Sequence, residues 1–359
     1  PEIIKLSPLL PLLQAQFDHV LVHSGQHYSY ELDARFFEEL SLPAPDHTLG
    51  AGSGSHGAQT ARMLAALEPI IQRERPDALL VQGDTNTTLA GALTAAKLHV
   101  PVVHVEAGCR SFNRAMPEEL NRVLVDHMAD LLFTPTDDAE QNLRAEGIGA
   151  ERSYLVGSTA IDACERNRSF AARSAILDQL ELVAGSYLVL TLHRAENTEP
   201  AVLPGIMRAL AELAAQQPII FPLHPRTEAA LQAQQLTLPE GVVRTAPLGY
   251  LDMLRLLGSA KALLTDSGGL QEEAAALRVP ALVLRRETEW HELVQAGMHT
   301  LAGNNYESIM QAADCALRPE NLRVARERPL ALRRGASDQI CSVLAGALRA
   351  TEPLLARAR

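Results

Sequence analysis

Short apolar runs rich in Val, Ile and Leu alternate with longer segments of helical periodicity along the whole chain. Such alternation is typical of parallel sheets covered by helices on both faces, so it predicts an α/β protein. The expected strands lie within residues 19–25, 77–84, 100–108, 130–136, 153–159, 186–194, 217–225, 241–248, 261–269 and 279–287.

A charged, Arg-rich helical stretch at residues 161–182 divides the expected strands into two groups. With 359 residues, of which 47% are hydrophobic, the chain can bury two cores of ordinary size. We therefore predict two doubly wound, Rossmann-like domains that face a central cleft. The first spans residues 1–160 and is joined by a C-terminal helix at 337–359, and the second spans residues 161–336.

Polar residues are concentrated where the expected strands end. In open α/β sheets, ligands bind at the carboxyl ends of the strands. We therefore predict that these polar residues line the cleft. They occur at residues 25–27, 83–85, 106–108, 193–194, 224–225, 266–269 and 285.

The segment from Lys261 to Leu277 runs from an apolar strand through Asp-Ser-Gly-Gly into a helix with Glu272 and Glu273 in its first turn. Glycines let the backbone approach a ligand, and the free N–H groups of a helix start favour an anion, which predicts a phosphate site. Glu273 could then accept hydrogen bonds from sugar hydroxyls. The alternative is an ordinary helix start with a Ser or Asp N-cap.

Three acids form a second candidate cluster. Asp84 and Glu106 each follow an expected strand, and Glu118 follows a proline at an expected helix start. Acids in such positions are candidates for proton transfer. Alternatively, the first two accept backbone hydrogen bonds in turns and Glu118 complements a helix dipole. The three acids together, with His193 and His224 at strand ends in the other half, favour chemistry.

Residues 52–57 satisfy the pattern G-x-G-x-x-G and open a helical segment. The preceding residues 41–50 contain two prolines and no convincing buried strand. Because the motif indicates dinucleotide binding only after a strand, we expect a flexible loop lining the cleft instead.

Charge and cysteine usage narrow the choice of partners. A formal net charge of −11 without a block of Lys or Arg makes nucleic acid and anionic membranes poor partners. No apolar run approaches the ~20 residues that a membrane helix needs. The four cysteines lack metal-binding spacing, and scattered thiols fit a reducing compartment. We therefore expect a cytoplasmic protein.

Seven motifs occur in order over nearly the whole chain. They read PEIIK at residues 1–5, GQH at 25–27, QGDTNTT at 82–88, HVEAGCRS at 104–111, PEELNR at 117–122, HRAEN at 193–197 and TDSGGLQEE at 265–273. This combination resembles the non-hydrolysing UDP-N-acetylglucosamine 2-epimerases. The resemblance implies the two-Rossmann GT-B fold of nucleotide-sugar glycosyltransferases, a homodimer, a UDP-sugar substrate, and neither a metal nor a nicotinamide cofactor.

The implied reaction inverts carbon 2 of the sugar in two stages. UDP is eliminated with loss of the carbon-2 proton, which gives a glycal, and UDP then adds back while a proton reaches the opposite face. The resemblance implies that the catalytic residues are Asp84, Glu106, Glu118 and His193. We expect proton transfer from Asp84 and Glu118, whereas Glu106 could equally be a positioning group.

Substrate binding is expected from a second set of residues. The Asp-Ser-Gly-Gly segment matches the family's pyrophosphate loop, and two basic residues near phosphate are expected to neutralise charge and so make UDP a better leaving group. The full set is Lys5, His224, Ser267, Gly268, Gly269, Glu273 and Arg285.

We therefore expect an enzyme that interconverts UDP-GlcNAc and UDP-ManNAc for cell-surface polysaccharide precursors. The open alternatives are an epimerase of a related UDP-acetamido sugar, a hydrolysing relative that releases ManNAc, and a GT-B glycosyltransferase, since fold alone cannot separate these. A transferase would not need three acids around one sugar. A binding-only module would bury several carboxylates without a use for them.

The chain departs from the family pattern at three places. Residues 1–5 begin inside a motif, at an expected helix start, so we expect the natural product to begin about ten residues earlier with a strand followed by Gly-Thr-Arg. Residues 28–30 read Tyr-Ser-Tyr where substrate-regulated members are polar, which puts allosteric activation in doubt. Trp290 and His291 stand where many relatives have Arg-Pro, which leaves the sugar specificity open.

Overall fold

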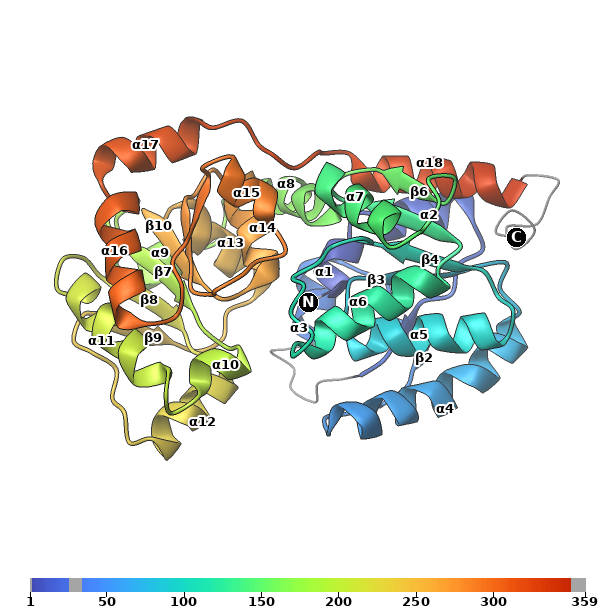
Figure 1. Ribbon diagram of the computed structural model, residues 1–359, viewed down its shortest axis with the longest axis horizontal. Coiled ribbons are helices and arrows are strands. Elements are labelled where there is room, and N and C mark those ends of the chain that lie inside the picture. Colours follow the sequence, from blue (N-terminus) through green and yellow to red (C-terminus); the bar gives the residue numbers. More distant parts are fainter. Residues whose placement is uncertain (1, 26–33, 350–359) are drawn as a thin grey trace. The chain divides into compact units, whose positions relative to one another are not determined.

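Two compact units make up the structure, a computed structural model that describes residues 2–25 and 34–349 (Figure 1). The first unit contains the chain up to Ala163 together with the segment from Leu332 onward, and the second runs from Cys164 to Ala331. Gln26 and His27 of the GQH motif lie outside the described residues, as do residues 28–30 and 350–359.

The described part of the first unit contains two parallel sheets. A two-stranded sheet pairs β1 with β2, and a four-stranded sheet has the order β3-β4-β5-β6. The strands are β1 (Val22–His23), β2 (His47–Thr48), β3 (Leu79–Gln82), β4 (Val102–Val105), β5 (Leu131–Thr134) and β6 (Ser153–Leu155). Strands β4 and β5 are buried along their whole length, as expected of a sheet that is covered on both faces.

Helices cover both faces of the four-stranded sheet. Apolar residues of α2 and α18 pack with β4 and β5 in one core, and those of α5, α6 and α7 pack with β3, β4 and β5 in another. The helices of this unit are α1 (Glu2–Leu6), α2 (Leu10–Gln16), α3 (Ala34–Glu39), α4 (His56–Glu74), α5 (Asn86–Lys97), α6 (Pro117–Met128), α7 (Asp137–Ala145) and α18 (Ala336–Arg349). Helix α8 (Thr159–Ala171) begins in the first unit and continues into the second.

The second unit is built on one parallel sheet of six strands in the order β12-β11-β10-β7-β8-β9. Because the order runs outward from β7 in both directions, the sheet is doubly wound, with its switch point between β7 and β10. The strands are β7 (Leu188–Thr191), β8 (Ile219–Pro222), β9 (Val242–Thr245), β10 (Ala262–Thr265), β11 (Ala281–Val283) and β12 (His299–Leu301).

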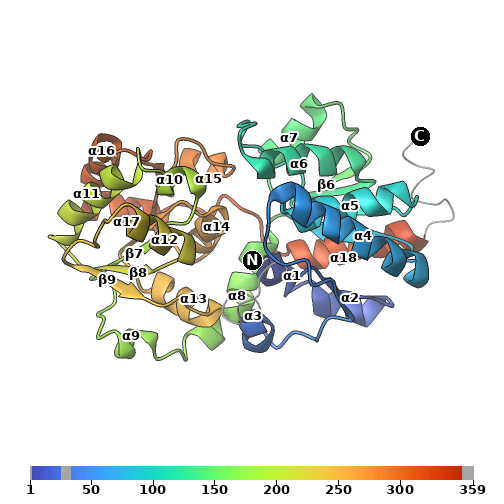
Figure 2. The same cartoon turned by 90° about the horizontal axis from the view of Figure 1, so that it is seen from below.

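Helices again cover both faces of this sheet. Figure 2 shows α11 and α16 on one side and α9 and α13 on the other, and each group shares a core with the strands. The helices are α9 (Ile176–Gln179), α10 (Ala195–Thr198), α11 (Leu203–Ala214), α12 (Pro225–Ala233), α13 (Tyr250–Gly258), α14 (Gly268–Ala276), α15 (His291–Gln295), α16 (Tyr306–Ala316) and α17 (Pro319–Glu327). No helix within the described residues is long and apolar enough to cross a membrane.

The structure confirms the predicted α/β class with parallel sheets, and ten of its strands lie within the predicted runs. The short strands β2 and β12 were not predicted. Two helix predictions need correction. The first helix is interrupted between Leu6 and Leu10, where Pro8 cannot continue the hydrogen-bond ladder. Helix α14 begins at Gly268, so Glu272 and Glu273 lie in its second turn rather than its first.

Candidate active site

Glu106 lies directly after β4 and is held by two side chains. Lys5 Nζ is 2.5 Å from Glu106 Oε2, and Gln82 Nε2 donates a hydrogen bond to the same oxygen at 2.9 Å. The backbone of Glu106 has a φ of 71°, which is unusual for a residue other than glycine. Such a conformation persists only where the surroundings impose it, and it is common at functional sites.

Asp84 leaves the sheet beside Glu106, because Gln82 of β3 pairs with Val105 of β4. Arg122 donates to Asp84 Oδ2 from Nε at 2.9 Å and from Nη2 at 2.6 Å. Within the described residues, the partners of both acids are therefore side chains, and neither acid accepts a hydrogen bond from a backbone turn. The Asp84 side chain remains 23% exposed, which leaves it accessible to a ligand.

Glu118 and Glu119 lie in the first turn of α6 but have different surroundings. The Glu119 carboxylate accepts hydrogen bonds from the backbone N–H groups of Ser111 and Phe112, both at 2.9 Å, and from Arg122 at 2.7 Å. It therefore braces the loop before the helix. Glu118 is half-buried, and no hydrogen bond or ion pair joins it to another residue in the described part of the chain. Glu118 is thus the acid that is available to a ligand.

Glu2 is a fourth acid in this region, and it was not predicted as a site residue from the sequence. Its Oε2 atom is buried without a hydrogen-bond partner among the described residues. A Cβ atom on Gly83 would lie 2.5 Å from that oxygen, so the carboxyl group packs directly on the Gly83 backbone. Burial, with added repulsion from Glu106 and Asp84, outweighs the attraction of Lys5 and raises the pKa of Glu2 to about 7.

A buried ion pair supports the loops that carry these acids. His104 is within 2.6 Å of Asp126 Oδ1 through Nδ1 and within 2.8 Å of the Gly83 carbonyl oxygen through Nε2. Both partners are acceptors, so both ring nitrogens donate and the imidazole is positively charged. Burial alone would lower the pKa of His104, but the Asp126 carboxylate raises it. Asp126 also contacts Arg110 at 2.7 Å, which fixes the chain after Glu106.

In the second unit, His193 follows β7 at the switch point of the sheet. Thr191 pairs with Thr265, so His193 and Asp266 leave adjacent strands side by side. Asp266 Oδ1 lies 3.0 Å from His193 Nδ1, and the carboxylate also accepts the backbone N–H groups of His193 and Arg194. Burial tends to raise the pKa of Asp266, yet its hydrogen bonds with His193 lower it. The His193 side chain is 37% exposed, so Asp266 orients a ring that solvent or a ligand can reach.

Ser267 is the N-cap of α14, and its side chain accepts a hydrogen bond from the backbone N–H of Leu270 at 3.4 Å. Gly268 is the first residue of the helix. A Cβ atom there would meet its nearest neighbours at 3.8 Å or more, which is ordinary van der Waals contact. The fold therefore leaves room for a side chain at Gly268, and the loop has the open backbone that anion binding needs. Gly269 follows as the second residue of the helix.

Arg285 is fully buried beside residues 266–269, the predicted phosphate loop. It donates to Glu289 Oε2 from Nη1 at 2.6 Å, and Arg194 Nη2 lies 3.4 Å from Glu289 Oε1. Arg194 also donates from Nε to the Asp266 carbonyl oxygen at 2.9 Å. Two guanidinium groups, from Arg194 and Arg285, thus lie beside the loop together with the carboxylates of Glu289 and Asp266.

The remaining predicted residues also lie in the second unit. His224 is the N-cap of α12, and its ring lies 5.5 Å from the His193 ring between centroids. Glu273 is half-buried near Cys164, whose thiol pKa is raised by burial and by the Glu273 charge. No cluster of three or more His, Cys, Asp or Glu side chains suited to a metal occurs within the described residues.

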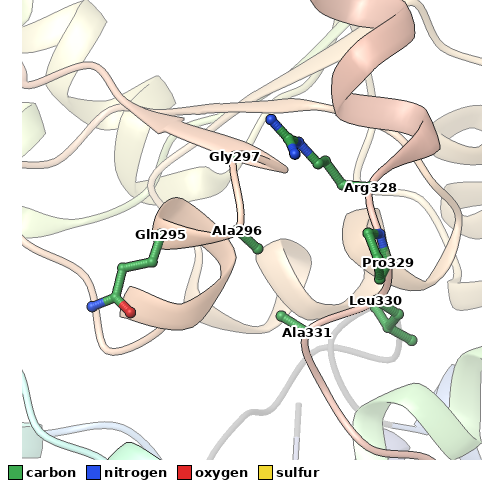
Figure 3. Close-up of a pocket in the computed structure, with 7 residues that line it drawn as sticks. All are labelled: Gln295, Ala296, Gly297, Arg328, Pro329, Leu330 and Ala331. Carbon is green, nitrogen blue, oxygen red and sulfur yellow. The ribbon is translucent and has the colours of Figure 1, made fainter.

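A surface pocket of about 400 Å³ lies elsewhere in the second unit (Figure 3). None of the predicted site residues lines it, and Arg328 is its one charged lining residue. The pocket is formed by Gln295, Ala296, Gly297, Arg328, Pro329, Leu330 and Ala331. It therefore contributes nothing to the acid cluster or to the phosphate loop.

Comparisons with known proteins show which family the chain resembles. The family described as UDP-N-acetylglucosamine 2-epimerase matches residues 12–345. UDP-N-acetylglucosamine 2-epimerase of Methanocaldococcus jannaschii is 44% identical over 88% of this chain and 90% of its own length. UDP-2,3-diacetamido-2,3-dideoxy-D-glucuronate 2-epimerase of Pseudomonas aeruginosa is 41% identical over 88% and 90%.

A solved structure shows the same likeness. The crystal structure of the M. jannaschii enzyme in complex with UDP-GlcNAc and UDP superposes with a TM-score of 0.90 at 42% identity, covering 96% of each chain. This likeness confirms the predicted GT-B fold class.

Proposed function

The chain belongs to the UDP-N-acetylglucosamine 2-epimerase family, and we propose that it interconverts UDP-GlcNAc and UDP-ManNAc without hydrolysis. The observation that carries this proposal is the pair of acids at adjacent strand ends, Asp84 and Glu106. A third acid, Glu118, follows Glu106 by 12 positions and has no partner among the described residues. Epimerisation needs one group to take a proton from carbon 2 and another to return a proton to the opposite face, which an acid cluster can supply.

In the proposed reaction, the carboxylate of one residue removes the carbon-2 proton while the bond between carbon 1 and the UDP oxygen breaks. UDP then attacks carbon 1 of the glycal, and the protonated carboxyl group of a second residue gives a proton to carbon 2. We assign the two transfers to Asp84 and Glu118. Glu106, fixed by Lys5 and Gln82, is proposed to position the sugar.

The second unit is proposed to bind UDP. Ser267, Gly268 and Gly269 would hold the pyrophosphate at the start of α14, and Arg285 supplies positive charge beside it. Glu273 would accept hydrogen bonds from the ribose. His193, oriented by Asp266, and the neighbouring His224 would face the departing phosphate, where donors stabilise growing negative charge.

A related sugar is a second candidate substrate. The Pseudomonas aeruginosa relative, at 41% identity, acts by its name on UDP-2,3-diacetamido-2,3-dideoxy-D-glucuronate. We therefore propose UDP-GlcNAc as the first substrate to test and this diacetamido uronate as the second.

Proton NMR of each UDP-sugar with the enzyme in deuterated water tests the proposal. Nucleotide-linked epimer carrying deuterium at carbon 2 is the expected product. Free ManNAc with UDP would instead indicate hydrolysis, and an unchanged spectrum with both sugars would contradict epimerase activity on either.

We further propose a cytoplasmic homodimer that supplies precursors of cell-surface polysaccharide. A dimer is supported by exposed apolar side chains on and near α6, namely Phe112, Leu120 and Leu124. The reducing compartment is supported by the four cysteines, none of which forms a disulfide within the described residues. Light scattering during gel filtration tests the dimer, and cell fractionation tests the location.

A further inference from the structure

Trp290 lies against the start of α14 with its indole nitrogen facing the phosphate loop. A Cβ atom on Gly268 would be 3.8 Å from Trp290 Nε1, so this nitrogen borders the space that the glycine leaves open. The side chain is only 2% exposed. Trp290 is the N-cap of α15. Helices α14 and α15 are neighbours in both views (Figures 1 and 2).

The indole N–H group has no acceptor in the described part of the chain, although the backbone N–H of Trp290 donates to Thr288 Oγ1 at 3.2 Å. The indole nitrogen is not among the fully buried side-chain atoms that lack a partner, so it is open to a ligand in the space that Gly268 leaves free. Because the start of α14 lies beside it and a helix start favours an anion, an anionic oxygen is the suitable acceptor.

Two side chains fix Trp290 to the loop. Thr288 Oγ1 donates to Gln271 Oε1 at 2.7 Å, and Gln271 Nε2 donates to the Ser267 carbonyl oxygen at 3.1 Å. The backbone of Trp290 is thus tied to the helix start that would hold the phosphate. Such preorganisation lowers the cost of ordering the donor when a ligand binds.

Glu289 is the negative group nearest to this position, with Oε2 at 3.9 Å from the same Gly268 Cβ site. Its charge is compensated by Arg285 at 2.6 Å. A neutral donor such as the indole can approach a phosphate oxygen here without drawing Arg285 away from Glu289.

We propose that Trp290 is a binding residue of the phosphate site, and that its indole N–H donates a hydrogen bond to a pyrophosphate oxygen of the nucleotide. This inference rests on the proposed UDP site. The indole would add an uncharged donor to the proposed UDP site, and this donor would contact the pyrophosphate rather than the sugar or the base.

The single tryptophan allows a direct test, because a ¹⁵N-labelled full-length chain has one indole N–H signal. We expect UDP and inorganic pyrophosphate to shift this signal to a saturable end point, and uridine to leave it in place. UDP that binds by calorimetry without moving the indole signal would overturn the proposal.

The variant Trp290→Phe removes the N–H donor and keeps an aromatic ring. In Trp290→Phe, UDP binding should weaken roughly 10- to 100-fold, the range for one hydrogen bond to a charged group, while uridine binding stays unchanged. The smaller ring should also lower the melting temperature modestly, because Trp290 is buried. Equal UDP affinity in both proteins would also overturn the proposal. If the unaltered chain binds no UDP, the proposed function fails, and the pyrophosphate titration still decides the role of Trp290.

Discussion

Lys5 Nζ and Glu106 Oε2 are 2.5 Å apart although the two residues are 101 positions apart in the chain. The pair joins α1 to the end of β4, and both side chains are at least 85% buried, since their exposed fractions are 13% and 15%. Removing one member of such a pair leaves an uncompensated charge in a poorly solvated place.

This relationship predicts strong coupling between the two side chains. Lys5→Met and Glu106→Gln should each lower the free energy of unfolding by about 1–3 kcal/mol, and the double variant should lose clearly less than the sum. Urea unfolding of the four proteins measures the coupling. The pair of Arg144 and Glu140, in which Arg144 is exposed and Glu140 half-buried, is the control, with an expected coupling of at most about 0.5 kcal/mol. Equal coupling in both pairs would contradict the prediction.

Proton transfer by Glu118 predicts a loss of turnover without a loss of binding. Glu118→Gln and Asp84→Asn should each lower turnover by about two to four powers of ten while UDP still binds, because the amides keep the shape but cannot transfer a proton. A coupled assay for the epimer and UDP calorimetry provide the two readouts. More than a tenth of normal turnover in both variants would rule out the assignment.

The neighbouring Glu119 is the control for that experiment. Glu119→Gln should weaken the charge-assisted bonds to Ser111, Phe112 and Arg122, and should lower stability by about 1–3 kcal/mol. Thermal unfolding should therefore separate two adjacent glutamates, with Glu118→Gln melting like the unaltered protein.

The raised pKa of Glu2 predicts a pH-dependent change in stability. The folded protein keeps a proton on Glu2 up to about pH 7, whereas the unfolded chain loses it near 4.5. The folded state thus binds more protons between these values, so stability falls as the pH rises through this window. Glu2→Gln removes the penalty and should be more stable than the unaltered protein by about 1–3 kcal/mol at pH 8, but not at pH 4. Denaturant unfolding at both pH values tests this. The exposed Glu327→Gln serves as the control, and a pH-independent difference for Glu2→Gln would refute the prediction.

The open space at Gly268 predicts a variant that folds normally and fails to bind. Gly268→Ala should keep or slightly raise the melting temperature, because alanine favours a helix and its Cβ makes only ordinary contacts. UDP affinity should fall roughly 10-fold or more, since the methyl group occupies the space for the phosphate. Gly258→Ala, with its nearest contact at 3.5 Å, is the control and should bind UDP normally. Unchanged UDP affinity in Gly268→Ala would contradict the site.

The strand ends were predictable from the sequence because a parallel sheet brings the carboxyl ends of its strands to one edge. The registers of Gln82 with Val105 and of Thr191 with Thr265 follow that rule, and they place Asp84 beside Glu106 and His193 beside Asp266.

The partners of these residues were not predictable. Consecutive helix residues point about 100° apart, and only the packing of α6 decides that Glu119 turns to the loop while Glu118 stays half-buried without a partner among the described residues. Glu2 was missed because its role depends on contact with Gly83, 81 positions away, for which one sequence has no local signal.

The return of α18 to the first unit has a consequence for synthesis on the ribosome. The chain from Cys164 to Ala331 is continuous and can form its six-stranded sheet as soon as it emerges. The first unit, although translated earlier, lacks Ile340, Cys341 and Leu344 from its core until the final part of the chain is made. The second unit can therefore complete its fold before the first unit does, although it is synthesised later. The first unit, which carries the acid cluster, completes its core only after α18 has been synthesised.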